Sequence, residues 1–407
     1  MSAENQYDVI IVGAGISGLS AGCAFNRRKN IKIACIEKKG IGSNNPSPLT
    51  FFDVIKEHNL LDCIKGGYLS FGFHNHKGSS IRFLFEDQRL VVLDYQKACI
   101  KLYNKIKTCH PDFSVINNEV IDVWNEEKGV CIKLKDEEVF HAKILIDCSG
   151  KEKLINRLFA SEKSELYSHV YGAIFSGLEG FEDNSAYYLW PVKDFGTGGG
   201  WFYPLNEGRA SFGYAAIADT PNIDYESLKE GFNNALQEFR PYNDYLRKGI
   251  IENVESGSIP VLYAERLVYP NILISGDAGG MATNWTCMGI EPSLQYGRLA
   301  GEFALKALID GDSQIIQEYQ TIWEKENKAT YDSFAKLAST FWNADYNVWE
   351  WIIKNDLAYL TPDQMLRRMR KNDNIIKKHQ ILFRALHNKI KNLFNKKSTL
   401  PEQITIQ

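Results

Sequence analysis

The chain lacks paired cysteines, long apolar runs and a charge excess of either sign. Its eight cysteines are scattered over 407 residues without a C-x-x-C pair, so we expect neither a disulfide framework nor a metal site. No apolar run approaches the roughly 20 residues needed to cross a bilayer. The net charge of -3 gives no reason to expect a nucleic-acid partner. The start of the chain shows no secretory pattern, and these absences together predict a reduced, cytoplasmic protein.

Length and composition bound the architecture but not the function. The chain is too long for one simple core, which predicts two or three domains. Apolar residues make up 44% and charged residues 24% of it, as is typical of a globular protein. Function therefore has to be sought in local motifs.

The N-terminal 37 residues have the pattern of a dinucleotide site. Residues 7–12 are apolar and rich in β-branched side chains, which predicts a buried strand. They run directly into a G-x-G-x-x-G turn made by Gly13, Gly15 and Gly18. These glycines permit a tight turn, close approach of a pyrophosphate and close helix packing, and the following helix start favours phosphate. A second strand ends at Glu37, which can accept the hydroxyls of an adenosine ribose.

Two later segments end in small residues after an apolar strand. Residues 144–150 end in Asp147-x-Ser149-Gly150, and residues 271–280 end in Gly276-Asp277 and further small residues. Small residues let the backbone pass close to a bound cofactor. By itself Asp277 is either a helix N-cap or a ligand for a polyol.

The remaining chain shows a change of pattern near its middle. Residues 40–48 predict a loop over the cofactor, residues 49–64 a helix, and residues 68–93 a hairpin on the cofactor domain. From residue 168 to residue 268, short aromatic and glycine-rich strands predict an antiparallel sheet inserted into the first domain. From residue 314 onwards the pattern is largely helical.

Together, the three motifs resemble the three fingerprints of the class A flavoprotein monooxygenase-type FAD enzymes. The likeness covers roughly residues 5–310. It implies an α/β fold with a Rossmann-type FAD-binding domain, an inserted antiparallel β-sheet substrate domain and a helical C-terminal region. The corresponding ranges are 1–160 and 265–311 for the FAD-binding domain, 161–264 for the substrate domain, and 312–407 for the helical region.

FAD is the cofactor that this resemblance implies. In such proteins the aspartate of the third motif binds the ribityl chain, and the helix that follows directs its N-terminus at the flavin. The residues expected to bind FAD are Gly13, Gly15, Ile16, Ser17, Gly18, Glu37, Lys38, Gly150, Gly276, Asp277, Gly289 and Ile290.

Within this superfamily the chain looks most like the geranylgeranyl reductase group, whose members use reduced FAD to saturate isoprenoid double bonds. The likeness rests on residues 276–301 and on the aromatic stretch 200–214. Trp285 departs from the group, which usually has proline there. Two other functions stay open: an oxygen-using monooxygenase or halogenase of aromatics or alkenes, and a non-redox cyclase that keeps its flavin reduced.

Aromatic side chains are the candidate substrate lining. Trp201, Tyr203 and Trp285 would form an apolar wall, although each could equally belong to the core. Tyr203 is also a candidate proton donor. No second nucleotide fingerprint is present, so we expect a separate electron donor: NAD(P)H, ferredoxin or a flavin reductase.

A last feature lies near the C-terminus. Between residues 375 and 394, apolar side chains recur at helical spacing among many lysines and arginines. Such a helix either lies in a lipid headgroup layer, giving peripheral membrane contact, or packs on the cofactor domain with its charges in water.

Overall fold

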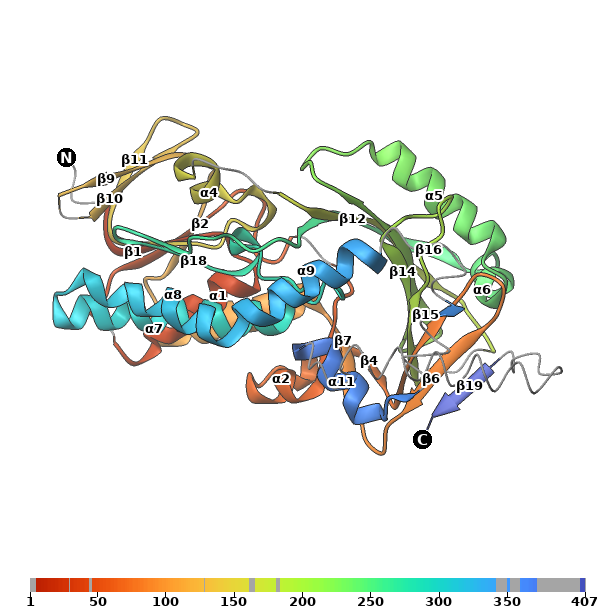
Figure 1. Cartoon of the computed structure of the whole chain (residues 1–407). Coiled ribbons are helices and arrows are strands. Elements are labelled where there is room, and N and C mark those ends of the chain that lie inside the picture. The colour runs from red at the N-terminus through yellow and green to blue at the C-terminus, as the bar shows by residue number, and fades with distance from the viewer. Residues whose placement is uncertain are drawn as a thin grey trace.

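The structure is a computed structural model, and it describes residues 5–28, 30–43, 46–127, 129–160, 165–180, 184–341, 350–351, 359–371 and 403–406. Two sheets lie side by side and form two parts of the molecule (Figure 1). The first part contains the N-terminal strand, and the second contains the aromatic strands of the middle of the chain. The predicted fold class, α/β with an inserted antiparallel sheet, is confirmed.

The first sheet has the N-terminal strand in its centre. Its order is β17 (Val268–Tyr269), β18 (Ile272–Ile274), β11 (Val139–Asp147), β1 (Gln6–Val12), β2 (Ile33–Glu37) and β8 (Ser114–Asn117), while β10 (Gly129–Leu134) and β9 (Val120–Glu126) continue from β11. The strands from β18 to β8 are parallel, so their carboxyl ends lie along one edge. Val9, Ile10 and Ile11 of β1 are fully buried, and each such side chain contributes about 1.5–3 kcal/mol.

Two helices, α1 (Ile16–Cys23) and α7 (Ile290–Asp310), pack closely against each other in this first part. Glycines permit the contact, because a Cβ atom at Gly297 or Gly301 would lie 2.3 Å from a carbonyl oxygen of α1. Gly297 meets Ser17 and Gly301 meets Ala21, so the contacts follow the same direction along both helices. The N-terminal ends of α1 and α7 therefore lie on the same side, where the parallel strands end.

The second sheet is mainly antiparallel. Its order is β16 (Ile250–Pro260), β12 (Tyr167–Ser176), β15 (Arg209–Ala218), β14 (Gly199–Leu205), β13 (Ser185–Leu189), β5 (Ser70–His74), β6 (Ser80–Leu84) and β19 (Gln403–Ile406). Helices α5 (Tyr225–Glu238) and α6 (Arg240–Leu246) cover one face (Figure 1), where Phe212, Phe232 and Phe239 share an apolar core. The opposite face is free of these helices.

Smaller elements connect the two parts. A short sheet is formed by β3 (Leu49–Phe51), β7 (Leu90–Leu93) and β4 (Ile64–Tyr68), and the further helices are α2 (Phe52–Glu57), α3 (Tyr95–Cys109), α4 (Leu154–Phe159), α8 (Gln317–Trp323), α9 (Ala329–Phe341) and α11 (Pro362–Lys371). Arg370 of α11 forms ion pairs with Asp53 of α2 at 2.7 Å and with Glu291 of α7 at 3.0 Å. Helix α11 is thereby fixed beside the start of α7.

Three local expectations differ from the structure. Residues 49–64 were expected to be one helix, but residues 49–51 form strand β3 because they pair with β7. The hairpin in residues 68–93 was expected on the cofactor domain, whereas β5 pairs with β13 and thus extends the second sheet. The C-terminal region was expected to be largely helical, but residues 403–406 form strand β19, which pairs with β6. The division into domains stays a proposal, with residues 70–84 lying in the second sheet.

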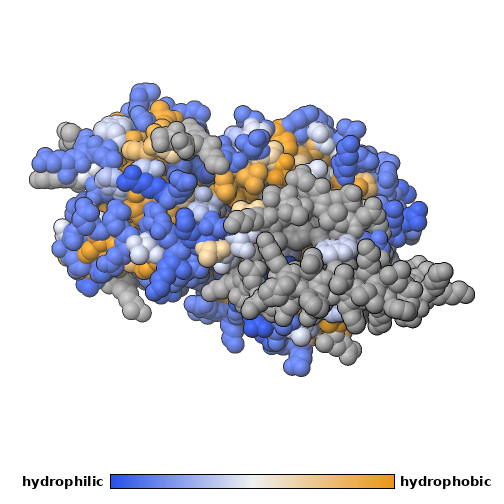
Figure 2. Space-filling view, viewed as in Figure 1, coloured by the Kyte–Doolittle hydropathy of each residue, from blue (hydrophilic) through white to orange (hydrophobic). Residues whose placement is uncertain are grey.

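The described residues give partial information on surface hydropathy and on membrane contact. Of the residues coloured in Figure 2, most are hydrophilic, and hydrophobic residues gather near the junction of the two parts. Among the helices that the structure describes, none has the length and apolar character to span a membrane. The apolar and basic stripe of residues 375–394 lies outside the described residues, so its two alternatives stay open.

Candidate cofactor and active site

The three motifs meet at one edge of the first sheet. The turn of Gly13 to Gly18 follows β1, Gly150 follows β11, and Gly276 follows β18. In the parallel register, Val12 lies opposite Asp147, and Asp147 lies opposite Ile274. The ends of these adjacent strands therefore place three sequence-distant turns side by side.

The first turn is held open by its glycines. Gly13 has a φ of +101°, and a Cβ atom there would lie 2.2 Å from the carbonyl oxygen of Cys148. At Gly18 a Cβ atom would lie 2.0 Å from the carbonyl oxygen of Gly13. Helix α1 starts with Gly15 as N-cap, which has no side chain to cap the helix, and the Ile16 N–H donates to the Tyr95 hydroxyl at 3.3 Å. The result is a close backbone cradle at a helix start, which suits a phosphate group.

Two charged residues lie at the end of β2. The Glu37 carboxylate accepts hydrogen bonds from the backbone N–H groups of Ala14 and Lys39, both at 2.8 Å. A carboxylate has about four acceptor positions, so Glu37 keeps capacity for ribose hydroxyls. The Lys38 ammonium instead forms an ion pair with Glu152 at 3.0 Å. Lys38 thus connects this strand end to the loop that contains Gly150.

Asp277 lies beside the start of α7. A Cβ atom on Gly289, the N-cap of α7, would lie 3.4 Å from Asp277 Oδ1. Among the described residues, no side chain or backbone group forms a hydrogen bond with the Asp277 carboxylate. Burial raises the pKa of this carboxyl to about 6. Of the two alternatives for Asp277, the N-cap role is not filled in this structure, because Ser275 and Gly289 are the N-caps of the adjoining helices. Its oxygens are available to a ligand.

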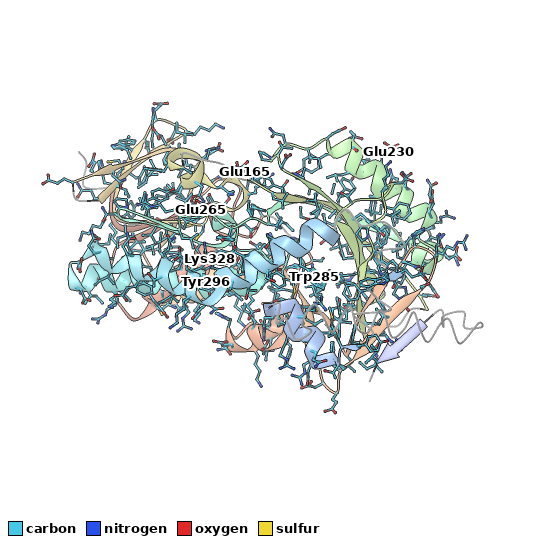
Figure 3. The ribbon with its side chains drawn as sticks, in the orientation of Figure 1. Glu165, Glu230, Glu265, Trp285, Tyr296 and Lys328 are labelled. Carbon is cyan, nitrogen blue, oxygen red and sulfur yellow. The ribbon has the colours of Figure 1, made fainter. Side chains whose placement is uncertain are left out.

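A cavity of about 440 Å³ separates the two sheets. Ile16, Asp277, Gly289 and Ile290 line it from the first part, and Trp201, Tyr203 and Trp285 complete the wall. Figure 3 shows Trp285 where the two parts meet. These predicted cofactor and substrate residues therefore line the same cavity. The other predicted cofactor residues lie outside the cavity wall, at or near the strand ends: Gly13, Gly15, Ser17, Gly18, Glu37, Lys38, Gly150 and Gly276.

These residues fit FAD in their chemistry. The glycine cradle at the start of α1 suits the pyrophosphate, and Glu37 suits the adenosine ribose. Among the described residues, the Asp277 carboxylate oxygens have no hydrogen-bond partner. The start of α7 also lacks a side-chain cap, so its N–H groups can meet the electron-rich edge of an isoalloxazine.

The Trp201 indole in the cavity wall lies flat against the neighbouring strands. In the cross-strand register, Trp201 is opposite Gly213, Gly213 is opposite Gly172, and Gly172 is opposite Glu255. A Cβ atom at Gly172 would lie 2.6 Å from Trp201 Cζ2, and one at Gly213 would lie 2.4 Å from it. The two glycines therefore make the space that the indole occupies.

A buried carboxyl group, that of Glu255 on β16, lies next in this row of cross-strand neighbours. The Trp201 indole N–H donates to Ser211 Oγ at 2.8 Å, and the Ser211 hydroxyl donates to Glu255 Oε2. Glu255 is 7% exposed and lines the cavity. Its second oxygen, Oε1, has no hydrogen-bond partner among the described residues. Burial raises the pKa of Glu255, although the Ser211 hydrogen bond and the positive charge of Lys65 oppose this.

The sequence analysis missed Glu255, because no motif surrounds it. Spacing gives no signal either, because seven consecutive residues of β16, from Asn253 to Ile259 and including Glu255, line the cavity. The candidate proton donor Tyr203 also lines the cavity and is 6% exposed. Burial, foremost, raises the pKa of Tyr203 well above its ordinary value. A phenol that holds its proton so firmly is a weaker acid than the carboxyl of Glu255.

Comparisons with known proteins agree with the three motifs. No family model matches the chain. Digeranylgeranylglycerophospholipid reductase 2 of Methanopyrus kandleri is 29% identical over 163 residues, which are 39% of this chain and 41% of that protein. The enzyme of the same name from Methanococcoides burtonii is 23% identical over 355 residues, 79% of this chain and 80% of that protein. By sequence, the chain is a relative of the geranylgeranyl reductases.

Solved structures agree on the fold. A geranylgeranyl bacteriochlorophyll reductase-like protein of Thermoplasma acidophilum has a TM-score of 0.70 at 19% identity, over 96% of this chain and 98% of that chain. A flavin-dependent brominase also has a TM-score of 0.70, at 16% identity, over 96% of this chain and 100% of that chain. The resemblance to an FAD-dependent superfamily close to the geranylgeranyl reductases is thus confirmed. The fold is shared by reductases and halogenating enzymes, so it does not choose between them.

Proposed function

We propose that this geranylgeranyl reductase relative is an FAD-dependent oxidoreductase that reduces carbon–carbon double bonds of an apolar, isoprenoid-like substrate. The observation that carries this proposal is the single cavity between the sheets. One wall consists of predicted flavin contacts, among them Asp277 and Gly289, and the other contains Trp201 and Tyr203. The names of the reductase relatives support the choice of substrate class.

Cofactor binding would involve the residues at the carboxyl ends of the parallel strands β1, β2 and β18. Gly13, Gly15 and Gly18 would hold the pyrophosphate, Glu37 the adenosine ribose, and Asp277 the ribityl chain. When bound and reduced, FAD supplies a hydride. The donor that reduces it is a separate partner: NAD(P)H, ferredoxin or a flavin reductase. We also propose a cytoplasmic location, with membrane contact through residues 375–394 as the alternative.

The protein itself would hold the substrate and the proton. Trp201, Tyr203 and Trp285 offer apolar surface and exclude water from the reacting double bond. Saturation of one double bond requires a hydride on one carbon and a proton on the other. Glu255 can hold that proton, because its carboxyl is buried at the cavity and burial raises its pKa. The carboxylate left behind would regain a proton from water.

Flavin-dependent oxygenation or halogenation is the second candidate function, favoured by the structural likeness to a flavin-dependent brominase. One experiment separates it from reduction. The FAD-loaded protein is reduced under argon, mixed with a geranylgeranyl lipid, and followed by flavin absorbance. Reoxidation that depends on the lipid, with one double bond saturated per flavin, supports the reductase. Reoxidation only on adding air, with a transient C4a-oxygen adduct, would contradict it, and substrate rearrangement while the flavin stays reduced would indicate the cyclase.

Trp201→Ala and Trp285→Ala should impair turnover without removing the flavin. Each substitution removes apolar contact worth about 1.5–3 kcal/mol, so kcat/KM should fall about 10- to 150-fold. The measurement is steady-state turnover together with the flavin spectrum. Trp124→Ala is the matched control, because Trp124 is 36% exposed and does not line the cavity. Loss of FAD or unfolding in either variant would place that tryptophan in the core rather than in the substrate wall.

A further inference from the structure

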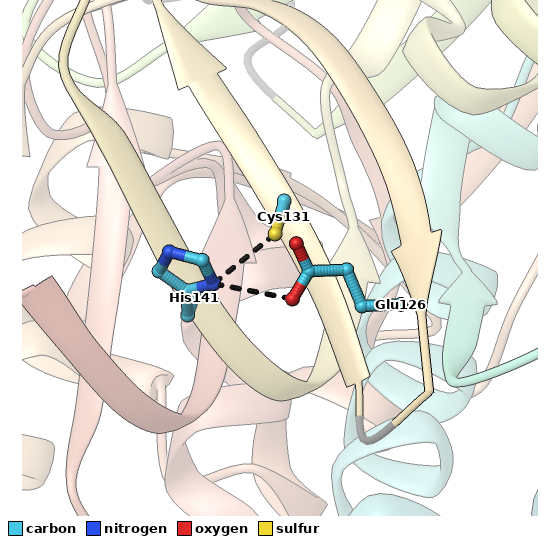
Figure 4. Close-up of side chains that lie close together, drawn as sticks. All are labelled: Glu126, Cys131 and His141. Atoms are coloured by element: carbon cyan, nitrogen blue, oxygen red, sulfur yellow. Dashed lines mark hydrogen bonds and ion pairs between the residues drawn. The ribbon is translucent and has the colours of Figure 1, made fainter. Parts of the chain in front are cut away.

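Three potential metal ligands come together on the outer hairpin of the first sheet. Glu126 ends β9, Cys131 lies in β10, and His141 lies in β11 (Figure 4). Cys131 is directly opposite His141 in the antiparallel register. The ligand atoms of all three residues lie within 4.8 Å of one another. Residues 5 to 15 positions apart in the sequence thus share one small volume.

The two distances from the His141 ring are close to those of a tetrahedral zinc site. His141 Nδ1 lies 3.1 Å from Cys131 Sγ and 3.6 Å from Glu126 Oε2. Zinc bonds of about 2.0–2.3 Å at tetrahedral angles place the ligand atoms about 3.3–3.6 Å apart. The two distances from His141 Nδ1 therefore differ from these values by a few tenths of an ångström, and the remaining pair, Cys131 Sγ and the Glu126 carboxylate, lies within 4.8 Å. From this geometry we propose that Glu126, Cys131 and His141 bind one Zn²⁺ ion.

The donor set selects the metal. A thiolate, an imidazole and a carboxylate suit Zn²⁺, whereas Mg²⁺ and Ca²⁺ prefer oxygen ligands alone. Cys131 is fully buried, but the Glu126 side chain is 46% and the His141 side chain 23% exposed. The fourth position of the metal consequently faces solvent and takes a water molecule.

The surrounding strands pre-organise this site. Glu126 is opposite Gly129, which has no side chain to fill the space beside the carboxylate. Gly129 itself has a φ of +150°, and a Cβ atom there would lie 2.2 Å from the carbonyl oxygen of Ala142 in β11. Strand β10 lies between β9 and β11, and the Glu126 side chain extends past Gly129 to His141 on β11.

The zinc site is separate from the flavin chemistry. None of the three residues lines the cavity, and the hairpin of β9 and β10 lies on the far side of the first part from the second sheet (Figure 1). The metal would connect β9, β10 and β11. Its binding therefore stabilises the folded chain and does not depend on the proposed reaction.

Zinc titration of the full-length, FAD-loaded protein tests the inference. The protein is freed of metal with a chelator and titrated with Zn²⁺ against a chromophoric zinc indicator. We expect one equivalent per chain, and binding weakened at least about 10-fold by Glu126→Gln, His141→Gln or Cys131→Ser. Co²⁺ in place of Zn²⁺ should give ligand-field absorption to the red of the flavin bands, lost in Cys131→Ser.

Two controls keep the result interpretable. Glu127→Gln makes the same charge change one residue further along the exposed end of the hairpin, and it should bind Zn²⁺ as the wild type does. Glu126→Gln changes an exposed side chain, so it tests the site even if Cys131→Ser fails to fold; the flavin spectrum reports folding. Absence of stoichiometric Zn²⁺ binding, or binding unchanged by Glu126→Gln and His141→Gln, would overturn the proposal and leave a hydrogen-bonded cluster without metal.

Discussion

Glu255→Gln is expected to lower the turnover of the apolar substrate by about 10²- to 10⁴-fold, the usual contribution of a general acid, and to leave FAD binding unchanged. Glutamine has nearly the same shape and can still accept the hydrogen bond from Ser211, so the cavity wall around Trp201 should remain intact. What is lost is the proton that the substrate carbon needs. Turnover and FAD affinity, measured on the same preparation, check this result.

The pH profile distinguishes a proton donor from a structural residue. An acid acts only while it is protonated, so turnover should fall as pH rises through the raised pKa of Glu255. Its polar surroundings are Ser211, Ser47 and Lys65, and of these only Lys65 also titrates. Glu255→Gln should remove this fall in turnover with rising pH. Lys65→Met should only shift the fall to higher pH. Glu252→Gln on the same strand is the control, because Glu252 is exposed.

A second readout does not require activity. The Trp201 indole is connected to Glu255 through Ser211, so ionisation of Glu255 should change the tryptophan fluorescence during a pH titration. This change should be absent in both Glu255→Gln and Trp201→Ala. Wild-type turnover in Glu255→Gln, with an unchanged pH profile, would rule out Glu255 as the proton donor.

Asp277→Ala should weaken FAD binding about 5- to 150-fold. The substitution leaves a buried ribityl hydroxyl without its acceptor, at a cost of about 1–3 kcal/mol. Fluorescence titration of the apoprotein with FAD measures the change. Asp310→Asn, an exposed site at the other end of α7, should bind FAD normally. Full retention of FAD by Asp277→Ala after dialysis would show that the third motif does not bind the ribityl chain.

FAD affinity should also depend on pH through Asp277. Burial raises the pKa of the free carboxyl to about 6, and a hydroxyl that donates to the carboxylate lowers it again on binding. FAD binding therefore releases a proton below about pH 6, and affinity should fall as pH decreases through this value, by at most 10-fold per pH unit. Asp277→Asn should remove this dependence. A wild-type affinity that is constant between about pH 5 and pH 8 would contradict it.

The sequence alone determined the features that arise within one short segment. The strand, glycine turn and helix from residue 7 to residue 23 are adjacent in the chain, and backbone sterics at Gly13 and Gly18 leave few alternatives for their conformation. Parallel strands also place their carboxyl ends together, so Gly13, Gly150 and Asp277 could be expected at one edge. The aromatic stretch that contains Trp201 and Tyr203 predicted a substrate wall, and both residues line the cavity.

Only the tertiary structure decided the features that depend on cross-strand register. Residues 49–51 became a strand because β7 pairs with them, and residues 70–84 joined the second sheet because β13 pairs with β5. The row from Trp201 over Gly213 and Gly172 to Glu255 crosses four strands, and a shift of one residue in any of them would turn its side chain to the other face. The cluster of Glu126, Cys131 and His141 depends on register in the same way. Register is set by long-range packing and not by local propensity, which is why neither the proposed proton donor nor the proposed zinc ligands could be found in the sequence.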